Sequence, residues 1–89
     1  MSAPYDVRSA EYLGGYRLRL SFADGTVRTV DLEAKLSGPV GPVFVPLQDV
    51  AFFAMVAVDP EAGTVVWPNG ADLAPEVLHA GAFDAAPAV

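Results

Sequence analysis

The chain has 89 residues, of which 53% are hydrophobic, and its formal net charge is −6. This length fits one small domain, and the hydrophobic fraction excludes intrinsic disorder for most of the chain. No apolar run approaches the ~20 residues that cross a bilayer, and the N-terminus lacks the features of a signal peptide, so we expect a cytoplasmic protein. The absence of cysteine excludes disulfides, thiolate zinc sites and cysteine nucleophiles.

The charge balance indicates which classes of partner the protein can bind. Nucleic-acid binding depends on neutralising phosphates, and only five Lys and Arg residues face eleven Asp and Glu residues. A local basic face is compatible with the four arginines in the first third, but the field of the whole molecule would repel DNA. We therefore expect no direct nucleic-acid partner and no membrane. An acidic surface suits solubility or a basic protein partner.

The clearest local pattern is an apolar–polar alternation over residues 16–22, which predicts a strand with one buried face. An aspartate–glycine pair at 24–25 then marks a hairpin. A two-residue turn would pair Leu18 with Asp31. A three-residue loop, with its glycine left-handed, pairs Leu18 with Val30 instead. We prefer the second register because it gathers more apolar side chains on one face.

A strand is also expected upstream, over residues 5–13, and it completes a three-stranded antiparallel meander. The apolar–polar alternation of this strand is irregular. Strict alternation places Val7 and Leu13 on one face and Ala10 and Tyr12 on the other. Both faces of this strand are therefore expected to be partly covered.

The middle of the chain predicts two short helical segments separated by an irregular linker. Residues 31–38 form a helical turn that ends at a glycine. Residues 38–47 are rich in Pro and Gly and should be irregular or extended, with the apolar residues 43–45 packing on the domain. A short amphipathic helix is expected over residues 50–54, with Asp49 as its N-cap.

The last third predicts a second hairpin and a last helix. Strands at 56–58 and 64–67 flank a turn at 59–63 that has proline at its second position. Pro75 suits the first position of the helix, and Gly81 suits its C-terminal cap.

These elements predict an α+β fold. It consists of a small antiparallel sheet, formed by a three-stranded N-terminal meander plus a second hairpin, with two or three short helices. We assign residues 1–81 to a single domain and expect residues 82–89 to be a frayed C-terminal tail.

Three motifs occur in a fixed order between Val7 and His79. They are the aspartate–glycine hairpin, the segment F-x-P-L-x-D-x-x-F-F, and the ending V-D-P-x-x-G-T-V-x-W-P-N-G-A-D-L-x-P-E-x-L. In these motifs the chain resembles the small bacterial domain-of-unknown-function 2442 family. Two departures are a longer Pro/Gly-rich linker before the second motif and Ala74, a poor capping residue, before Pro75.

The resemblance implies a small α+β domain with a mostly antiparallel sheet, and it implies no established activity. Some relatives carry an additional helix-turn-helix domain, which we do not expect in this chain. Many are encoded beside another small protein, an arrangement that suggests a toxin–antitoxin-like pair.

The segment from residue 65 to 79 concentrates the candidate chemistry, because it holds the only tryptophan and the only histidine. Trp67 is either a stacking platform for a base or sugar or a core aromatic, and we favour the core. Asn69 and Gly70 either cradle an anion with backbone N–H groups or form a turn. We favour the turn, since both residues tolerate positive φ.

Asp72, Glu76 and His79 form the only group that resembles a metal or acid–base constellation. Glu76 and His79 are three apart and share a helix face. A carboxylate-bridged metal site needs a second such pair, however, and a protease zinc helix needs a second histidine. Asp72 is explained as a local backbone hydrogen-bonder before the helix. We therefore expect no catalytic set, no metal and no cofactor.

Arg17 and Arg19 are placed by the preferred register on the solvent face of the second strand, beside a sheet edge. They either contact an acidic partner or form an ordinary solvated face that discourages edge pairing, and the second reading is favoured.

Two functional hypotheses follow. The first is a non-catalytic protein-interaction module, an antitoxin-like partner of a small cognate protein encoded nearby. An exposed apolar patch near Phe44, Phe52 and Trp67, or an unpaired sheet edge, would support it. A sheet edge is also a candidate surface for homo-oligomerisation. The alternative is a small-ligand or metal-binding protein, or an enzyme, that uses the segment from Trp67 to His79.

Overall fold

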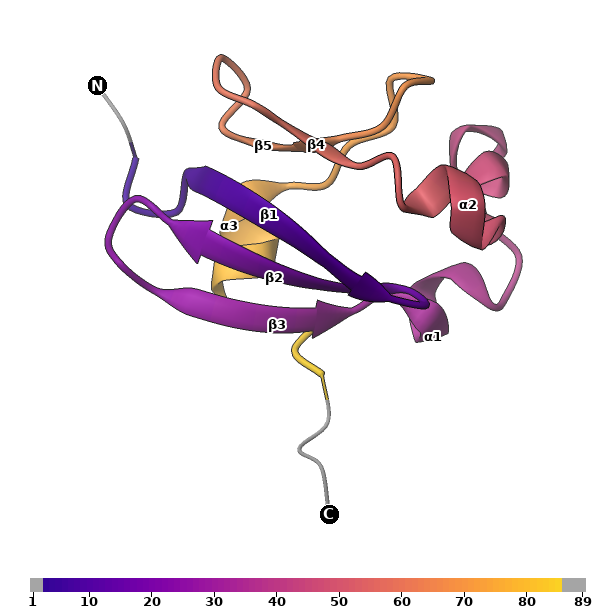
Figure 1. Cartoon of the computed structure of the whole chain (residues 1–89), viewed down its shortest axis with the longest axis horizontal. Coiled ribbons are helices and arrows are strands. Elements are labelled where there is room, and N and C mark those ends of the chain that lie inside the picture. The colour runs from indigo at the N-terminus through magenta and orange to yellow at the C-terminus, as the bar shows by residue number, and fades with distance from the viewer. Residues whose placement is uncertain (1–2, 86–89) are drawn as a thin grey trace.

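A computed structural model describes residues 3–85 of the chain (Figure 1). In chain order the elements are β1 (Val7–Gly14), β2 (Arg17–Phe22), β3 (Val27–Asp31), α1 (Glu33–Leu36), the 3-10 helix η1 (Pro42–Gln48), α2 (Val50–Phe53), β4 (Ala57–Asp59), β5 (Thr64–Val66) and α3 (Pro75–His79). The first three strands form one antiparallel sheet in the order β1-β2-β3, and β4 and β5 form a separate hairpin. The predicted α+β class and both predicted hairpins are confirmed.

The β2–β3 hairpin has the register that the apolar pattern favoured. Leu18 pairs with Val30, and both are fully buried. The backbone N–H of Phe22 donates to the Thr26 carbonyl at 2.8 Å, which leaves a three-residue loop. Gly25 ends that loop at φ 88°, the left-handed conformation that glycine adopts without strain.

The face assignment predicted for the first strand is wrong. The register between β1 and β2 shifts after Val7 and again after Tyr12, so each shift inserts one extra residue into β1. As a result Val7 is buried in the core and Ala10 and Tyr12 pack against it, whereas Leu13 is 41% exposed. An inserted residue reverses the side-chain alternation, which simple periodicity cannot anticipate.

The core lies between the sheet and the later elements. In Figure 1, α3 lies behind the three-stranded sheet, the β4–β5 hairpin runs beyond β1, and α2 lies at one end. Phe53 of α2 is fully buried, and its ring lies 5.4 Å from the ring of Tyr16 and 5.5 Å from that of Trp67, between centroids. This aromatic cluster therefore joins α2, the sheet and the segment after β5.

The linker over residues 38–47 is more regular than predicted, because its second half belongs to η1. Three residues per turn place Phe44 and Leu47 on the same side of this 3-10 helix. Leu47 is buried and Phe44 packs against the core, but Val43 and Val45 are 43% and 50% exposed. The expectation that all of residues 43–45 pack on the domain is therefore correct only for Phe44.

The two short helices that flank β4 and β5 begin where the capping residues indicate. The Asp49 carboxylate accepts the Ala51 N–H at 2.9 Å at the start of α2. Pro75 occupies the first turn of α3. At the end of α3, the Gly81 N–H donates to the Leu78 carbonyl at 3.2 Å, and Gly81 has φ 90°.

The segment after α3 lies beside β3 rather than fraying at once. The Asp31 N–H donates to the Phe83 carbonyl and the Ala85 N–H donates to the Thr29 carbonyl, both at 2.9 Å. Residues 83–85 of the expected tail are thus attached to the sheet, because their backbone groups find partners on its edge. Residues 86–89 lie outside the described part of the chain. No helix between residues 3 and 85 is long and apolar enough to cross a membrane.

Candidate functional site

Trp67 is a core residue. Its side chain is 2% exposed, and its indole N–H donates to the Phe53 carbonyl at 2.9 Å. The backbone closes a turn directly after it, with the Trp67 N–H donating to Ala71 and the Gly70 N–H donating to Trp67, each at 2.9 Å. The core interpretation is confirmed, and no face of the indole is free to stack on a ligand.

Asn69 and Gly70 form the turn, as favoured. The Asn69 carboxamide oxygen accepts the Ala71 N–H at 3.2 Å, and its NH2 group donates to the Val43 carbonyl at 2.8 Å. The backbone N–H groups of both Gly70 and Ala71 therefore have acceptors within the protein. The Asn69 side chain connects this turn to η1.

Asp72, Glu76 and His79 do not converge. Asp72 and Glu76 are exposed, and within residues 3–85 no group of three or more His, Asp or Glu side chains could hold a metal ion. The prediction that Asp72 braces the local backbone is wrong. Its side chain makes no hydrogen bond to the described residues, and Asn69 supplies the side-chain oxygen of this turn.

His79 faces the β2–β3 hairpin. Its Nε2 lies 2.8 Å from the Asp24 carboxylate, and its ring meets the Phe22 ring edge-on at 5.0 Å between centroids. The pKa of Asp24 is lowered to about 2, first by the backbone N–H of Thr26 and then by the Thr26 hydroxyl and His79. His79 therefore attaches the end of α3 to the tip of the hairpin.

Arg28 extends this contact. Its Nε donates to the His79 carbonyl at 2.6 Å, and its Nη1 pairs with the Asp84 carboxylate at 2.8 Å. A cation at this position stabilises the negative, carboxyl end of a helix. We call Asp24, Arg28, His79 and Asp84 the α3-end cluster.

Sequence reasoning missed the α3-end cluster because its bonded partners lie 51–56 residues apart in the chain. The preferred register of the β2–β3 hairpin contained one indication that Arg28 needs such partners. That register pairs Arg28 with Leu20, so the guanidinium lies on the core-facing side of β3 and needs a polar partner there.

Arg17 and Arg19 lie on the central strand rather than beside a sheet edge. Arg17 pairs with Asp31 at 3.2 Å and Arg19 pairs with Glu11 at 2.8 Å, in both cases across neighbouring strands. Since β2 is paired on both sides, these arginines do not protect an edge. They form cross-strand ion pairs on the exposed face, where solvent leaves such pairs little net energy.

Exposed aliphatic side chains lie on η1, on α2 and at Met55, two residues after α2. We define the η1–α2 surface as Val43, Val45, Val50 and Met55, which are 43–57% exposed. Asp49 is the only charged residue between positions 38 and 58. Phe44 and Phe52 pack against the core and Trp67 is buried, so the exposed apolar side chains of this region are the aliphatic ones.

The charge of the chain is divided unevenly along its length. All five Lys and Arg residues lie within residues 1–35, together with five of the carboxylates, so that segment is neutral. Residues 36–89 contain six carboxylates and no Lys or Arg, and they account for the whole net charge of −6. Of these six, Asp84 pairs with Arg28, and the other five form no ion pair with a described cation.

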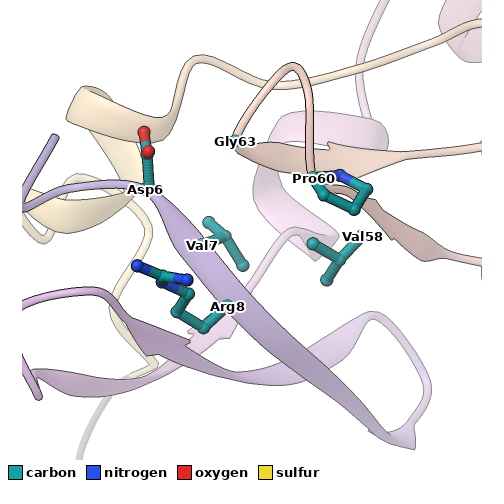
Figure 2. Close-up of a pocket in the computed structure, with 6 residues that line it drawn as sticks. All are labelled: Asp6, Val7, Arg8, Val58, Pro60 and Gly63. Carbon is teal, nitrogen blue, oxygen red and sulfur yellow. The ribbon is translucent and has the colours of Figure 1, made fainter. Parts of the chain in front are cut away.

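A small cavity lies between the start of β1 and the β4–β5 hairpin (Figure 2). Its volume is about 150 Å³, and its lining consists of Asp6, Val7, Arg8, Val58, Pro60 and Gly63. Cavities that bury a cofactor or drug-sized ligand usually measure about 300–1,000 Å³. None of the candidate residues between Trp67 and His79 lines this cavity.

The sequence of the chain matches one known protein family. The model of one family, described as "Protein of unknown function (DUF2442)", matches residues 7–84. The chain belongs to this family. No curated protein and no solved structure matches the chain. The DUF2442 match spans every strand and helix described above and ends at Asp84, which is the residue that pairs with Arg28.

Several residues of the motifs on which the resemblance rested have structural roles in this chain. Asp49 caps α2, Trp67 packs in the core, Asn69 braces a turn and Pro75 begins α3. Residues 65–79, where the candidate site residues are concentrated, therefore form the structural connection between β5 and α3.

Proposed function

We propose that this DUF2442 protein is a non-catalytic interaction module of the cytoplasm that binds a small basic protein, as an antitoxin binds its cognate partner. The observation that carries the proposal is the exposure of the four aliphatic side chains of the η1–α2 surface, on the part of the chain that supplies all the net negative charge. In this proposal the four side chains form one contiguous patch, and contiguous exposed apolar patches mark interaction surfaces.

The exposed side chains supply the apolar part of the binding free energy. Val45 and Met55 are 50% and 57% exposed, so a partner that covers them removes apolar area from water. Fully burying such a side chain stabilises a complex by about 1.5–3 kcal/mol, and half-exposed side chains contribute roughly half of that. Few charges interrupt the patch, as is typical of the core of an interface.

The carboxylates of the same part of the chain add selectivity. Asp49, Asp59 and Glu61 form no ion pair with a described cation, so their field is not cancelled locally. Complementary charge steers the encounter of two proteins and raises the association rate. The preferred partner is therefore a protein with an apolar contact surface bordered by Lys and Arg.

The ligand or metal alternative has less support. Asp72 and Glu76 are exposed and separate from His79, whose ring is engaged by Asp24 and Phe22. A catalytic role would require these groups to meet a common substrate atom.

Copurification with the small protein encoded beside this chain tests the proposal. We expect a complex at micromolar concentrations, with slower association at high salt. Val45→Glu places a charge in the contact and should weaken binding by about tenfold or more. Val77→Glu is the matched control, because Val77 is a 40% exposed valine on α3, outside the η1–α2 surface. Absence of a complex, or equal effects of the two substitutions, would refute the proposal.

A further inference from the structure

The two outer edges of the three-stranded sheet are built differently. β1 pairs with β2 through two register shifts, and such bulges twist an edge away from a further strand. β3 pairs with β2 without a shift, from Asp31 opposite Arg17 to Val27 opposite Ser21. The regular β3 edge is thus the better template for an added strand.

Residues of the chain itself occupy this edge. Asp84 forms an antiparallel bridge with Val30, and the hydrogen bonds of Phe83 and Ala85 to β3 flank that bridge. Figure 1 shows the segment after α3 emerging beside β3. The backbone groups of this β3 edge therefore accept an antiparallel partner, at one bridge with a hydrogen bond on either side.

Side chains add selectivity to the backbone contacts. The Phe83 ring packs against the core, and the Lys35 ammonium lies 5.8 Å from its centroid. The Asp84 carboxylate pairs with Arg28, whose guanidinium is already oriented by its hydrogen bond to the His79 carbonyl. The internal segment thus presents an aromatic residue followed by a carboxylate to this edge.

The attachment of the segment is limited. It spans three residues with two backbone hydrogen bonds, and the side chains of Arg28 and Asp84 are 30% and 42% exposed. Partly exposed ion pairs hold a segment weakly. A competing strand with the same chemistry has to displace these contacts and the packed Phe83 ring, and it replaces each of them with an equivalent contact.

We propose that the outer edge of β3 is a binding site for an extended peptide segment with an aromatic residue followed by a carboxylate, and that residues 83–85 are its internal occupant. The ligand binds by adding a strand to the sheet, with its carboxylate on Arg28. This site goes beyond the proposed function, because it involves other residues than the η1–α2 surface and a different kind of ligand.

Residues 83–85 are tethered to the domain, so a test of the site has to weaken their competition with an added peptide. A segment attached to the domain by a short connection competes at an effective concentration of roughly millimolar, so a free peptide gains access when the internal segment is weakened. Ala85→Pro in the full chain removes the N–H that donates to the Thr29 carbonyl and leaves every buried side chain in place.

The probe is a fluorescein-labelled peptide with the sequence of residues 81–89, GAFDAAPAV, titrated with the full chain. The Ala85→Pro chain should bind it about tenfold more tightly than the unmodified chain. Peptides with Phe83→Ala or Asp84→Asn are the matched controls, and each should bind the Ala85→Pro chain several-fold more weakly. Amide chemical shifts should change at residues 29–31.

Equal binding to the two chains, equal binding of the three peptides, or shift changes away from β3 would overturn the proposal. Circular dichroism verifies that the Ala85→Pro chain is folded. Asp84→Asn in the full chain provides a second way to weaken the internal segment, by removing the ion pair with Arg28. Val45→Glu should leave peptide binding unchanged, so this proposal and the proposed function can fail separately.

Discussion

Replacing Trp67 by phenylalanine tests whether this residue stabilises the core or stacks on a ligand. The indole is 2% exposed, and its N–H donates to the Phe53 carbonyl at 2.9 Å. That carbonyl also accepts the Val56 N–H at 3.2 Å, so Trp67→Phe would not leave it without a donor. The cost of the lost hydrogen bond should therefore be near the usual net value of about 1 kcal/mol.

The smaller ring adds a cavity beside Phe53, which costs about 1–2 kcal/mol when the neighbours relax only in part. Together these effects predict a loss of about 2–3 kcal/mol in the free energy of unfolding. In a domain of this size, that loss corresponds to a melting temperature lower by roughly 10–20 °C. Small domains are commonly stable by about 5–15 kcal/mol, so the variant should still fold.

Urea unfolding followed by circular dichroism measures this loss, since the substitution removes the only tryptophan fluorophore. Tyr5→Phe is the control, because Tyr5 is 37% exposed and its replacement should change stability by less than about 0.5 kcal/mol. The folded Trp67→Phe chain should bind its protein partner as the unmodified chain does. An unchanged unfolding midpoint, or a folded variant that no longer binds, would refute the core assignment.

Three further predictions concern a buried hydroxyl, a titrating carboxylate and a helix cap. Thr64 is 3% exposed and its hydroxyl donates to the Leu73 carbonyl at 2.6 Å, so Thr64→Val should lower the free energy of urea unfolding by about 1–2 kcal/mol, whereas Thr64→Ser should keep the hydrogen bond. The pKa of Asp24 is lowered in the folded state from 3.8 to about 2, so its stabilising effect is present above pH 3.8 and is lost as the pH falls through 2. Acid unfolding of Asp24→Asn should therefore show a weaker pH dependence in that window, and an identical profile would contradict the assignment. Gly81→Ala should lower the melting temperature more than Gly70→Ala does. Both glycines have positive φ, but an added Cβ at Gly81 would lie 3.0 Å from the Asp84 carboxylate, whereas at Gly70 it would meet nothing within 4 Å.

The features that could be predicted from the sequence are those that neighbouring residues decide. The alternation in β2 and the glycine at position 25 select the register of the hairpin, because every other register moves apolar side chains to the exposed face. Asp49 and Pro75 mark helix starts, since a carboxylate acceptor and a preset φ act within one turn.

The candidate site could be predicted only in part. The core position of Trp67 and the turn at Asn69 follow from common preferences of these residue types. The separation of Asp72 from His79 could not be predicted from the sequence. Helical spacing relates Glu76 to His79, but it does not determine the conformation of the loop that precedes the helix.

Packing in three dimensions determines which distant groups meet. The bulges in β1 reverse its alternation so that Val7, Ala10 and Tyr12 all face the core, a choice made by packing rather than by local preference. Arg28 and His79 acquire their partners from segments more than 50 residues away, at the point where α3 ends against the hairpin. Local sequence is enough to predict the strands, the hairpin turns and the starts of α2 and α3, because those depend on contacts within a few residues. The surfaces that a partner could meet depend on how these elements pack, since packing selects which apolar side chains remain in water.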